Sequence, residues 1–164
     1  MRKVILSVAV SLDGMIEGPK GEYDWCPPPS KQEMNNFLNK VDAIFYGRKS
    51  FELTGASFRN KAHYVFSNSL KTAKGAHVIN GDAKEKVAEL KRQVGKDIWL
   101  FGGASLLTFF MNENLVDEMW LGVVPIVLGS GKPLFSGINQ RSHFKLIESI
   151  PRKGYLSLYY QSNS

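Results

Sequence analysis

Cysteine is nearly absent from this sequence. The single Cys26 among 164 residues cannot form a disulfide within the chain, and no metal-ligand spacing surrounds it. The three histidines, His63, His77 and His143, lie far apart and show no ligand spacing either. The sequence therefore indicates neither a disulfide framework nor a metal site. No Ser–His–Asp or Cys–His catalytic set can be named from spacing.

Long apolar runs are also missing. No run approaches the ~20 residues of a membrane-spanning helix. Met1-Arg2-Lys3 followed by the apolar residues 4–10 superficially resembles a signal peptide. The run is short, however, and Asp13 follows it without a small-residue cleavage site. We therefore expect a cytoplasmic protein with no membrane partner.

Acidic residues are outnumbered, 15 to 21, which gives a formal net charge of +6. A modest excess of this kind favours anionic partners, including phosphorylated small molecules. The basic residues are scattered and form no run interleaved with aromatics, so nucleic acid is the less favoured partner. The length and the 43% hydrophobic content suit one domain spanning residues 1–164, without linker or repeat.

Apolar runs alternate with helical patterns along the chain. Ser30 with Glu33, and Asp82 with Glu85, have the spacing of capping boxes that begin helices. The second helix is expected to end at Gly95, with Val94 facing the core. Short apolar runs predict buried strands at residues 4–10, 43–46, 63–66, 77–79 and 98–101.

The C-terminal third has a different pattern. Residues 118–128 predict a long strand interrupted by Pro125. Residues 144–149 and 155–160 predict an antiparallel hairpin, because their connection is too short for a crossover helix. The whole pattern predicts an α/β fold with a mostly parallel sheet, helices on both faces and an antiparallel C-terminal strand.

The centre of this pattern is the stretch 97–107, in which an apolar run breaks at Gly102-Gly103 and resumes from Ala104. Glycine permits positive φ and a close approach of other groups, and the first N–H groups of a helix lack intrahelical partners. The stretch therefore predicts a strand, a phosphate-binding turn and a helix. A plain tight β–α turn remains an open alternative.

Four polar or glycine-bearing clusters follow predicted strands, where open parallel sheets bind their ligands. They are Asp13-Gly14, Gly47-Arg48-Lys49-Ser50, Ser67-Asn68 and Gly102-Gly103-Ala104-Ser105. Together they suit a dinucleotide, and Arg48 or Lys49 would favour NADP over NAD by neutralising an added phosphate. No G-x-G-x-x-G follows the first strand, and Pro133 removes the phosphate-loop pattern at residues 129–132.

Several ordered motifs then carry a resemblance that covers nearly the whole chain. They are Ser11-Leu12-Asp13-Gly14-x-Ile16, Asp42-Ala43-Ile44-x-Tyr46-Gly47-Arg48, Trp99-x-x-Gly102-Gly103-x-x-Leu106, Asp117-Glu118 and Pro125-x-x-Leu128-Gly129-x-Gly131-x-Pro133-Leu134-Phe135. The chain resembles the dihydrofolate reductase superfamily, and most closely the C-terminal reductase domain of the bacterial riboflavin-biosynthesis deaminase–reductase and its stand-alone relatives. The resemblance implies a three-layer fold, NADPH as cofactor and a homodimer.

The resemblance also implies roles for individual residues. Ala9, Asp13 and Trp25 would border the nicotinamide and the substrate. The cofactor would contact Gly47, Arg48, Lys49, Ser50, Ser67, Asn68, Gly102, Gly103, Ala104, Ser105 and Leu106. Leu106 also fits a plain core position.

Two carboxylates are candidates for catalysis. Dihydrofolate reductases place a carboxylate early in the first long helix, and Glu33 is the nearest here, although a capping role also explains it. Asp13 is the other, and ordering a turn beside Gly14 is its alternative role. Trp25 is interpreted as a lid over the site or as an anchor for its loop.

These observations support three hypotheses. The first is an NADPH-dependent reductase of a small heterocycle, most like 5-amino-6-(5-phosphoribosylamino)uracil reductase, or else a reductase of dihydrofolate or pterins. Water or Asp13 would then supply the proton that follows hydride transfer. The second is a non-catalytic NADPH-binding module, and the third is a small-molecule-binding protein that takes no dinucleotide.

Overall fold

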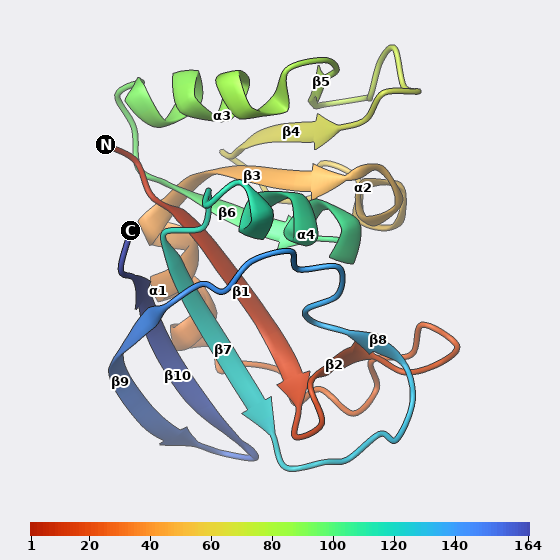
Figure 1. The fold of residues 1–164 in the computed structure, drawn as a ribbon, viewed down its shortest axis with the longest axis vertical. Coiled ribbons are helices and arrows are strands. Elements are labelled where there is room, and N and C mark those ends of the chain that lie inside the picture. The colour runs from red at the N-terminus through yellow and green to blue at the C-terminus, as the bar shows by residue number, and fades with distance from the viewer.

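The computed structural model describes all residues 1–164 and is built on one eight-stranded sheet. The strand order is β5-β4-β3-β6-β1-β7-β10-β9. All neighbours from β5 to β7 run parallel, whereas β10 is antiparallel to both β7 and β9 (Figure 1). A second, two-stranded sheet pairs β2 with β8. The predicted α/β class and the antiparallel C-terminal hairpin are confirmed.

Strands and helices alternate along the chain up to α4, except that β2 directly follows β1 and β5 directly follows β4. Their bounds are β1 Val4–Ser11, β2 Met15–Glu17, α1 Lys31–Lys40, β3 Val41–Gly47, α2 Arg48–Thr54, β4 Ala62–Phe66, β5 His77–Ile79, α3 Ala83–Arg92, β6 Asp97–Gly102, α4 Ala104–Asn112, β7 Glu118–Val124, β8 Lys132–Pro133, β9 Phe144–Arg152 and β10 Tyr155–Ser162. None of the four helices is both long and apolar enough to cross a lipid bilayer.

Two apolar clusters lie on opposite faces of the sheet, because successive strand residues point to opposite sides. The larger cluster packs α3 and α4 against one face, through residues such as Leu90 and Phe110. The smaller packs α1 and α2 against the other, through Phe37 and Phe51. The prediction of helices on both faces is therefore confirmed.

The strands β1 and β6 pair only over the first part of β1 and then diverge. They pair from Val4–Ile98 to Leu6–Leu100 and no further. Beyond this point β1 keeps its pairing with β7 as far as Ser11, while β6 continues beside β3 to Gly102. The sheet consequently opens into two halves toward the carboxyl ends of these strands, as the diverging ribbons in Figure 1 show.

Two local predictions are wrong, and one short strand pair was missed. The strand predicted over residues 118–128 ends at Val124, because Pro125 cannot donate a ladder hydrogen bond. Helix α3 ends at Arg92 with Gln93 as its C-cap rather than at Gly95, so Val94 lies outside the helix and is fully exposed instead of facing the core. The short β2–β8 pair was not predicted.

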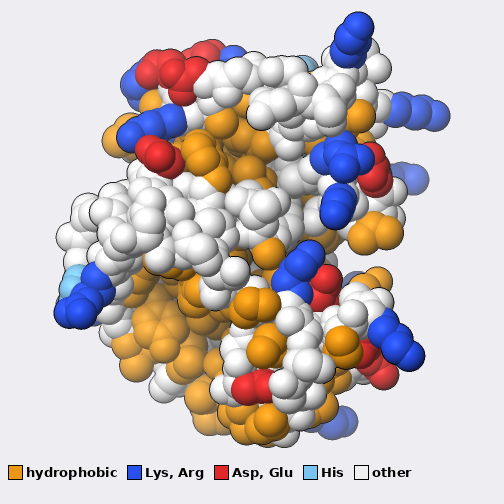
Figure 2. Space-filling view, turned by 45° about the vertical axis from the view of Figure 1, so that its right-hand side comes forward, with side chains coloured by type: hydrophobic (Ala, Val, Ile, Leu, Met, Phe, Trp, Pro, Cys, Tyr) orange, Lys and Arg blue, Asp and Glu red, His pale blue; other side chains and the backbone are white.

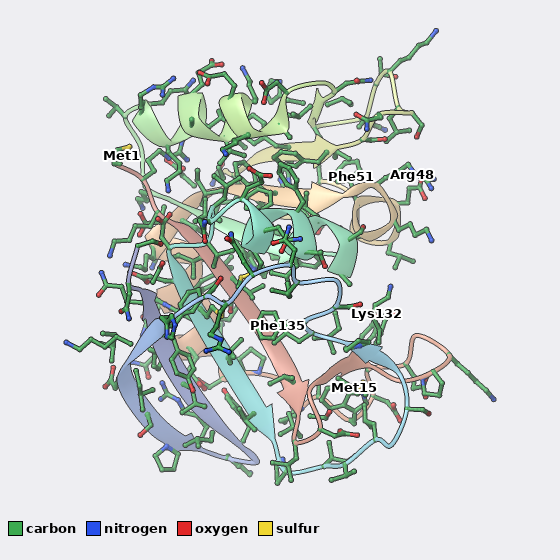
Figure 3. All side chains as sticks on the ribbon, viewed as in Figure 1. Met1, Met15, Arg48, Phe51, Lys132 and Phe135 are labelled. Atoms are coloured by element: carbon green, nitrogen blue, oxygen red, sulfur yellow. The ribbon has the colours of Figure 1, made fainter.

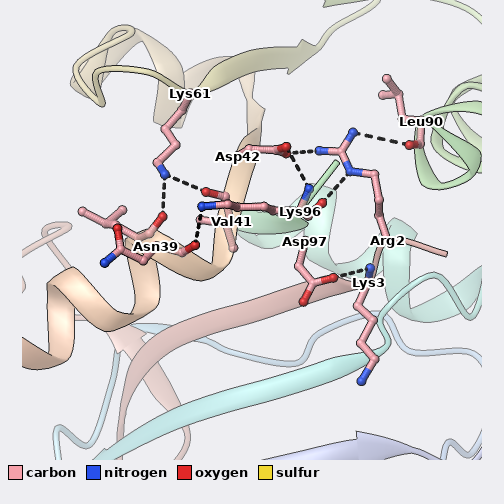
Figure 4. A network of polar contacts seen from close by, with 10 residues as sticks. Arg2, Lys3, Asn39, Val41, Asp42, Lys61, Leu90, Lys96 and Asp97 are labelled. Atoms are coloured by element: carbon pink, nitrogen blue, oxygen red, sulfur yellow. Dashed lines mark hydrogen bonds and ion pairs between the residues drawn. The ribbon is translucent and has the colours of Figure 1, made fainter. Parts of the chain in front are cut away.

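A polar network holds the amino-terminal ends of the strands opposite the carboxyl-terminal rim (Figure 4). Arg2 is buried and pairs with Asp42, while its Nε donates to the carbonyl of Lys96. The Lys61 ammonium donates to the carbonyls of Leu38 and Val41 at the end of α1. These cationic donors satisfy carbonyls that a helix end leaves without partners, and so they fix the position of α1.

Replacing Lys61 by methionine tests this anchoring. Lys61→Met keeps much of the side-chain volume but removes both charged hydrogen bonds, so we expect a loss of about 1–2 kcal/mol in the free energy of unfolding. Urea denaturation measures this loss. The control is Lys71→Met, because Lys71 is exposed and makes no ion pair or side-chain hydrogen bond. Equal stabilities of the two variants would contradict the anchoring role.

Candidate functional site

A cavity of about 810 Å³ lies between α1 and the half of the sheet formed by β1, β7, β10 and β9. Its walls combine aromatic rings with a few charged and amide side chains. The lining residues are Ser7, Val8, Ala9, Pro27, Pro29, Ser30, Gln32, Glu33, Met34, Asn36, Phe37, Trp99, Glu118, Trp120, Leu121, Gly122, Val124, Ile147, Glu148, Arg152, Tyr155, Ser157, Leu158, Tyr159, Tyr160 and Gln161. Its size and mixed lining are those of a small-molecule site.

Aromatic packing sets the depth of this cavity. Phe37 on α1 contacts Trp99 of β6 and Trp120 of β7, with ring centroids 5.1 and 5.2 Å away. Trp120 in turn packs edge-on against Tyr159 of β10 at 5.1 Å. Because these rings are wedged between helix and sheet, they hold α1 away from β10 and leave the space between them open.

Glu33 is the central charged group of the cavity wall. Its Oε2 accepts a hydrogen bond from the Ser30 backbone (2.9 Å), and Ser30 Oγ accepts from the Glu33 backbone, which completes the predicted capping box. Its Oε1 accepts from the Tyr155 hydroxyl (2.5 Å) and pairs with Arg152 Nε (3.1 Å). The bonds from Ser30 and Tyr155 lower the pKa of Glu33 to about 2. The predicted capping role of Glu33 is thus confirmed and the side chain also lines the cavity, whereas its catalytic role stays a prediction.

A second feature, the carboxyl-terminal rim, lies where β4, β3 and β6 end. Gly47 is opposite Phe66 of β4 in the register, and its neighbour Tyr46 is opposite Gly102 of β6. A Cβ on Gly47 would stand 3.3 Å from the backbone nitrogen of Gly103. The predicted cofactor residues at these three strand ends therefore meet along one edge of the sheet.

The rim is made of glycine backbone and helix starts. Gly102 has φ +125°, which side-chain-bearing residues rarely adopt, and its peptide bond to Gly103 is cis. Helices α2 and α4 begin directly at Arg48 and Ala104, and neither has a side-chain cap on its N-terminus. Their first N–H groups are therefore available to an anionic ligand, as are the outward positions of Ser50 and Ser105.

Two cations stand on this rim. Arg48 Nη1 pairs with Glu52 one turn further along α2 at 3.1 Å, and both side chains remain substantially exposed. Lys49 is exposed and forms no ion pair. Figure 3 shows Arg48 projecting at the edge of the molecule where β3 ends, on the same side as Met15 and Lys132 of the small sheet.

The remaining predicted rim residues have mainly structural contacts. Ser67 Oγ accepts hydrogen bonds from the backbones of Ser69 and Leu70, and the carbonyl of Asn68 accepts from Asn80. Leu106 is buried in the larger apolar cluster, and its Cβ would lie 3.8 Å from a Cβ on Gly47, so it packs beneath the rim. These residues shape the rim and offer backbone groups to it.

Asp13 and Trp25 do not line the cavity. Asp13 Oδ1 accepts from the Ser11 hydroxyl (2.6 Å) and the Leu128 backbone, and Oδ2 accepts from the Gly129 backbone (2.8 Å). These bonds, led by the one from Ser11, lower the pKa of Asp13 to about 2. The carboxylate thus ties the loop after β1 to the turn after β7, which fits the turn-ordering alternative.

Trp25 lies in the loop between β2 and α1 and is half-buried. Its indole donates to the Glu22 carbonyl at 3.2 Å within the same loop. The two later loop residues Pro27 and Pro29 reach the cavity instead, and Pro27 lies close to the β9–β10 turn at Gly154. The loop thus borders the cavity through its prolines.

Ala9 is the predicted nicotinamide-side residue that the structure places in the cavity. It lines the cavity from the part of β1 that no longer pairs with β6.

The important residues that sequence reasoning missed are Arg152, Tyr155 and Trp120. Arg152 stands out in the sequence as a cation next to a hairpin turn, but nothing in the chain order places it beside Glu33.

Comparison with known proteins identifies the family to which this chain belongs. The model of the RibD C-terminal domain matches residues 2–153. Protein YyaP of Bacillus subtilis (strain 168), itself uncharacterised, is 43% identical over 165 residues, covering 90% of this chain and 88% of its own. YwjB of the same organism, also uncharacterised, is 38% identical over 155 residues, covering 88% and 89%.

Solved structures agree on the fold. A protein assigned to riboflavin biosynthesis in Shewanella sp. PV-4 superimposes with a TM-score of 0.87 at 24% identity, covering 99% of both chains. A Thermotoga maritima deaminase/reductase gives 0.75 at 15% identity, covering 98% of this chain and 56% of its own. Dihydrofolate reductase from Enterococcus faecalis gives 0.75 at 15%, covering 99% and 97%. The chain belongs to the RibD C-terminal domain family and has the dihydrofolate reductase-like fold.

Proposed function

We propose that this protein is an NADPH-dependent reductase of a small heterocycle. The observation that carries the proposal is the adjacency of two sites along β1. A glycine-lined rim with two exposed cations lies at the ends of β3 and β6, and an aromatic cavity opens on the other side of the gap between β6 and β1. Ala9 lines the cavity from the part of β1 beyond its last pairing with β6, so a cofactor that reached from the rim across this gap would present its reactive end to the cavity.

The rim residues fit a dinucleotide. A Cβ on Gly103 would lie 3.3 Å from Ser50 Oγ, and one on Gly47 would crowd the Gly102–Gly103 backbone. Glycine at these positions keeps a cradle clear for the pyrophosphate, and the uncapped starts of α2 and α4 supply N–H donors. Arg48 and Lys49 would hold the additional phosphate of NADP. When bound, the cofactor supplies the hydride.

The relatives support this choice of cofactor and reaction. The Enterococcus faecalis dihydrofolate reductase was solved in complex with NADP(H), and the Thermotoga maritima protein is described as a 5-amino-6-(5-phosphoribosylamino)uracil reductase. We take that uracil and the dihydropterins as the two reference substrate types. The position of Glu33 on the cavity side of α1 favours keeping the pterin type.

The protein's own groups orient the substrate rather than protonate it. Glu33 and Asp13 both have a pKa of about 2, so each is ionised at neutral pH and has no proton to donate. Asp13 also lies outside the cavity lining. Water entering the open cavity is therefore the proton source we propose.

Cofactor binding and turnover test the proposal in sequence. NADPH titrated into the purified protein should change the cofactor fluorescence, and absence of any change at millimolar NADPH would contradict the proposal. NADPH absorbance is then followed with ribosylaminopyrimidines and dihydropterins. Binding without oxidation of any of them would instead support a non-catalytic NADPH-binding module. This alternative is tested as well because the carboxylates of Glu33 and Asp13 are both occupied by hydrogen bonds within the protein.

We also propose a homodimer formed through the open face of the β7–β10–β9 end of the sheet. Leu146 of β9 and Leu156 of β10 are 52% and 37% exposed, and β9 is an edge strand that pairs only with β10. Figure 2 shows apolar side chains gathered on the lower part of the molecule. Exposed apolar surface next to an open edge commonly marks an interface.

The cofactor prediction concerns Arg48. We expect Arg48→Ala to raise the Kd for NADPH about tenfold, equivalent to about 1.4 kcal/mol, and to leave the Kd for NADH nearly unchanged. Cofactor fluorescence gives both constants. Arg92→Ala is the matched control, because Arg92 also pairs with a glutamate of its own helix but lies at the end of α3. Equal weakening of NADPH and NADH would contradict the role of Arg48.

The acid–base prediction concerns Glu33. Its pKa is lowered from 4.5 to about 2, so its contribution to stability is complete above its unfolded pKa and is lost as the pH falls toward 2. We expect Glu33→Gln to cost about 1–2 kcal/mol at neutral pH, and the difference from wild type to shrink between about pH 5 and pH 2.5. Urea denaturation across this range measures it.

The control for this experiment is Glu89→Gln, since Glu89 is an exposed partner of Lys86 on α3. It should change stability by less than about 0.5 kcal/mol at every pH. A pH-independent effect of Glu33→Gln would show that the charge of Glu33 does not stabilise the fold.

The dimer prediction concerns Leu146. The wild-type protein should sediment as a dimer, and Leu146→Lys should shift it toward monomer by placing a charge in the apolar contact. Leu53→Lys is the control, because Leu53 is 87% exposed on α2, away from this face. A wild-type monomer at all concentrations would contradict the interface.

A further inference from the structure

The charges on the cavity wall are unusual for a chain with a formal net charge of +6. The cavity is lined by three carboxylates, Glu33, Glu118 and Glu148, and by a single cation, Arg152. The Arg152 guanidinium is already engaged, with Glu33 at 3.1 Å, the Ser157 hydroxyl at 3.3 Å and the Tyr159 hydroxyl at 3.2 Å. The wall therefore offers an anion more repulsion than attraction.

The nearest lysines do not alter this balance. Lys3 pairs with Glu118 at 2.6 Å, and Lys40 pairs with Asp97 at 3.3 Å while lying 5.7 Å from the centre of the Trp120 ring. Neither lines the cavity. Phosphate groups are held in proteins by free Arg or Lys side chains or by open helix N-termini.

The N-terminus of the helix beside the cavity is also unavailable to a phosphate, because it is capped by side chains of the protein. Helix α1 starts beside the cavity, but its capping box uses the Ser30 hydroxyl on the Glu33 backbone and the Glu33 carboxylate on the Ser30 backbone. A negative side chain of the protein thus occupies the place where a ligand phosphate would be favoured. This contrasts with α2 and α4 on the rim, which carry no side-chain caps.

Several polar side chains on the cavity wall have no partner within the chain, among them two amides on α1 and one carboxylate on β9. Gln32 and Asn36 lie one turn apart on α1, and Glu148 projects from β9. None of the three side chains makes a hydrogen bond or ion pair within the chain. Amides donate to carbonyls and accept from ring N–H groups, and a carboxylate accepts from amino groups. The aromatic side chains that line the cavity, Trp120 and Tyr155 among them, offer flat surfaces suited to stacking of a planar ring.

We propose that the cavity selects a planar nitrogen heterocycle that bears carbonyl and amino groups, is uncharged or cationic, and carries no phosphate. The inference rests on the proposed function only in placing the substrate in this cavity. The proposal assigns the phosphate groups of the cofactor to the rim. The substrate in the cavity carries no phosphate group. Glu148 is assigned as a specificity residue that disfavours phosphorylated compounds.

A matched pair of ligands tests the proposal. Calorimetry compares 5-amino-6-ribosylaminouracil with its 5′-phosphate, with and without saturating NADP⁺, so that only the phosphate differs. We expect the unphosphorylated compound to bind at least about tenfold more tightly. Equal or tighter binding of the phosphate would overturn the proposal, as would failure of both compounds to bind at millimolar concentration in either state.

Charge reversal at one wall position provides the second arm. Glu148→Lys should reduce the preference for the unphosphorylated compound severalfold or reverse it. Glu89→Lys, which makes the same charge change on α3, should leave the preference as in wild type. An unchanged preference in Glu148→Lys would remove Glu148 from the proposal. Heterocycle binding without NADPH oxidation would refute the reductase function while leaving this inference standing, so the two failures are distinguishable.

Discussion

The parting of β1 from β6 after Leu6 is the constraint on which the rest of this structure depends. A parallel sheet that stayed closed would bury its strands between helices and leave only the tips of the loops for a ligand. Here β1 follows β7 into one half of the sheet and β6 follows β3 into the other. The gap lies between a glycine-lined rim at the ends of β3 and β6 and an aromatic cavity, and Ala9 on the freed part of β1 lines that cavity. Chemistry between two bound molecules requires such an arrangement.

The second constraint is the fixed charge of Glu33. One carboxylate caps α1, accepts from Tyr155 and pairs with Arg152, so it joins the helix to the β9–β10 hairpin across the cavity. These contacts keep the cavity walls at a defined separation, but they also hold the group ionised. In the reaction proposed above, a carboxylate used in this way would orient a substrate and stabilise positive charge, and the proton would come from solvent. The contacts that hold the cavity walls together and the ionised state of the carboxylate therefore depend on the same residue, Glu33.

Much of the fold could be predicted because its signals are local. Buried parallel strands are continuous apolar runs, and the caps at Ser30 and Asp82 are visible in the sequence. The rim was also predictable, since the carboxyl ends of adjacent parallel strands meet on one edge. The cavity was not. Its wall brings Glu33 to Arg152 and Tyr155, over a hundred residues away in the chain, and only the antiparallel hairpin folding back beside β7 makes that contact. Val94 shows the converse, a residue in phase with a helical pattern that extends beyond the helix itself.

Net charge illustrates the same limit. The excess of six positive charges indicates an anionic partner, and the exposed Arg48 and Lys49 on the rim give that partner a place. Extending the argument to the substrate fails, because charges act over short distances in salt and each site is governed by its own wall. Within the cavity the local balance is acidic, and its one arginine is paired. A protein can thus be basic as a whole, bind an anionic cofactor and still exclude an anionic substrate, provided that the two sites are separated by a strand such as β1.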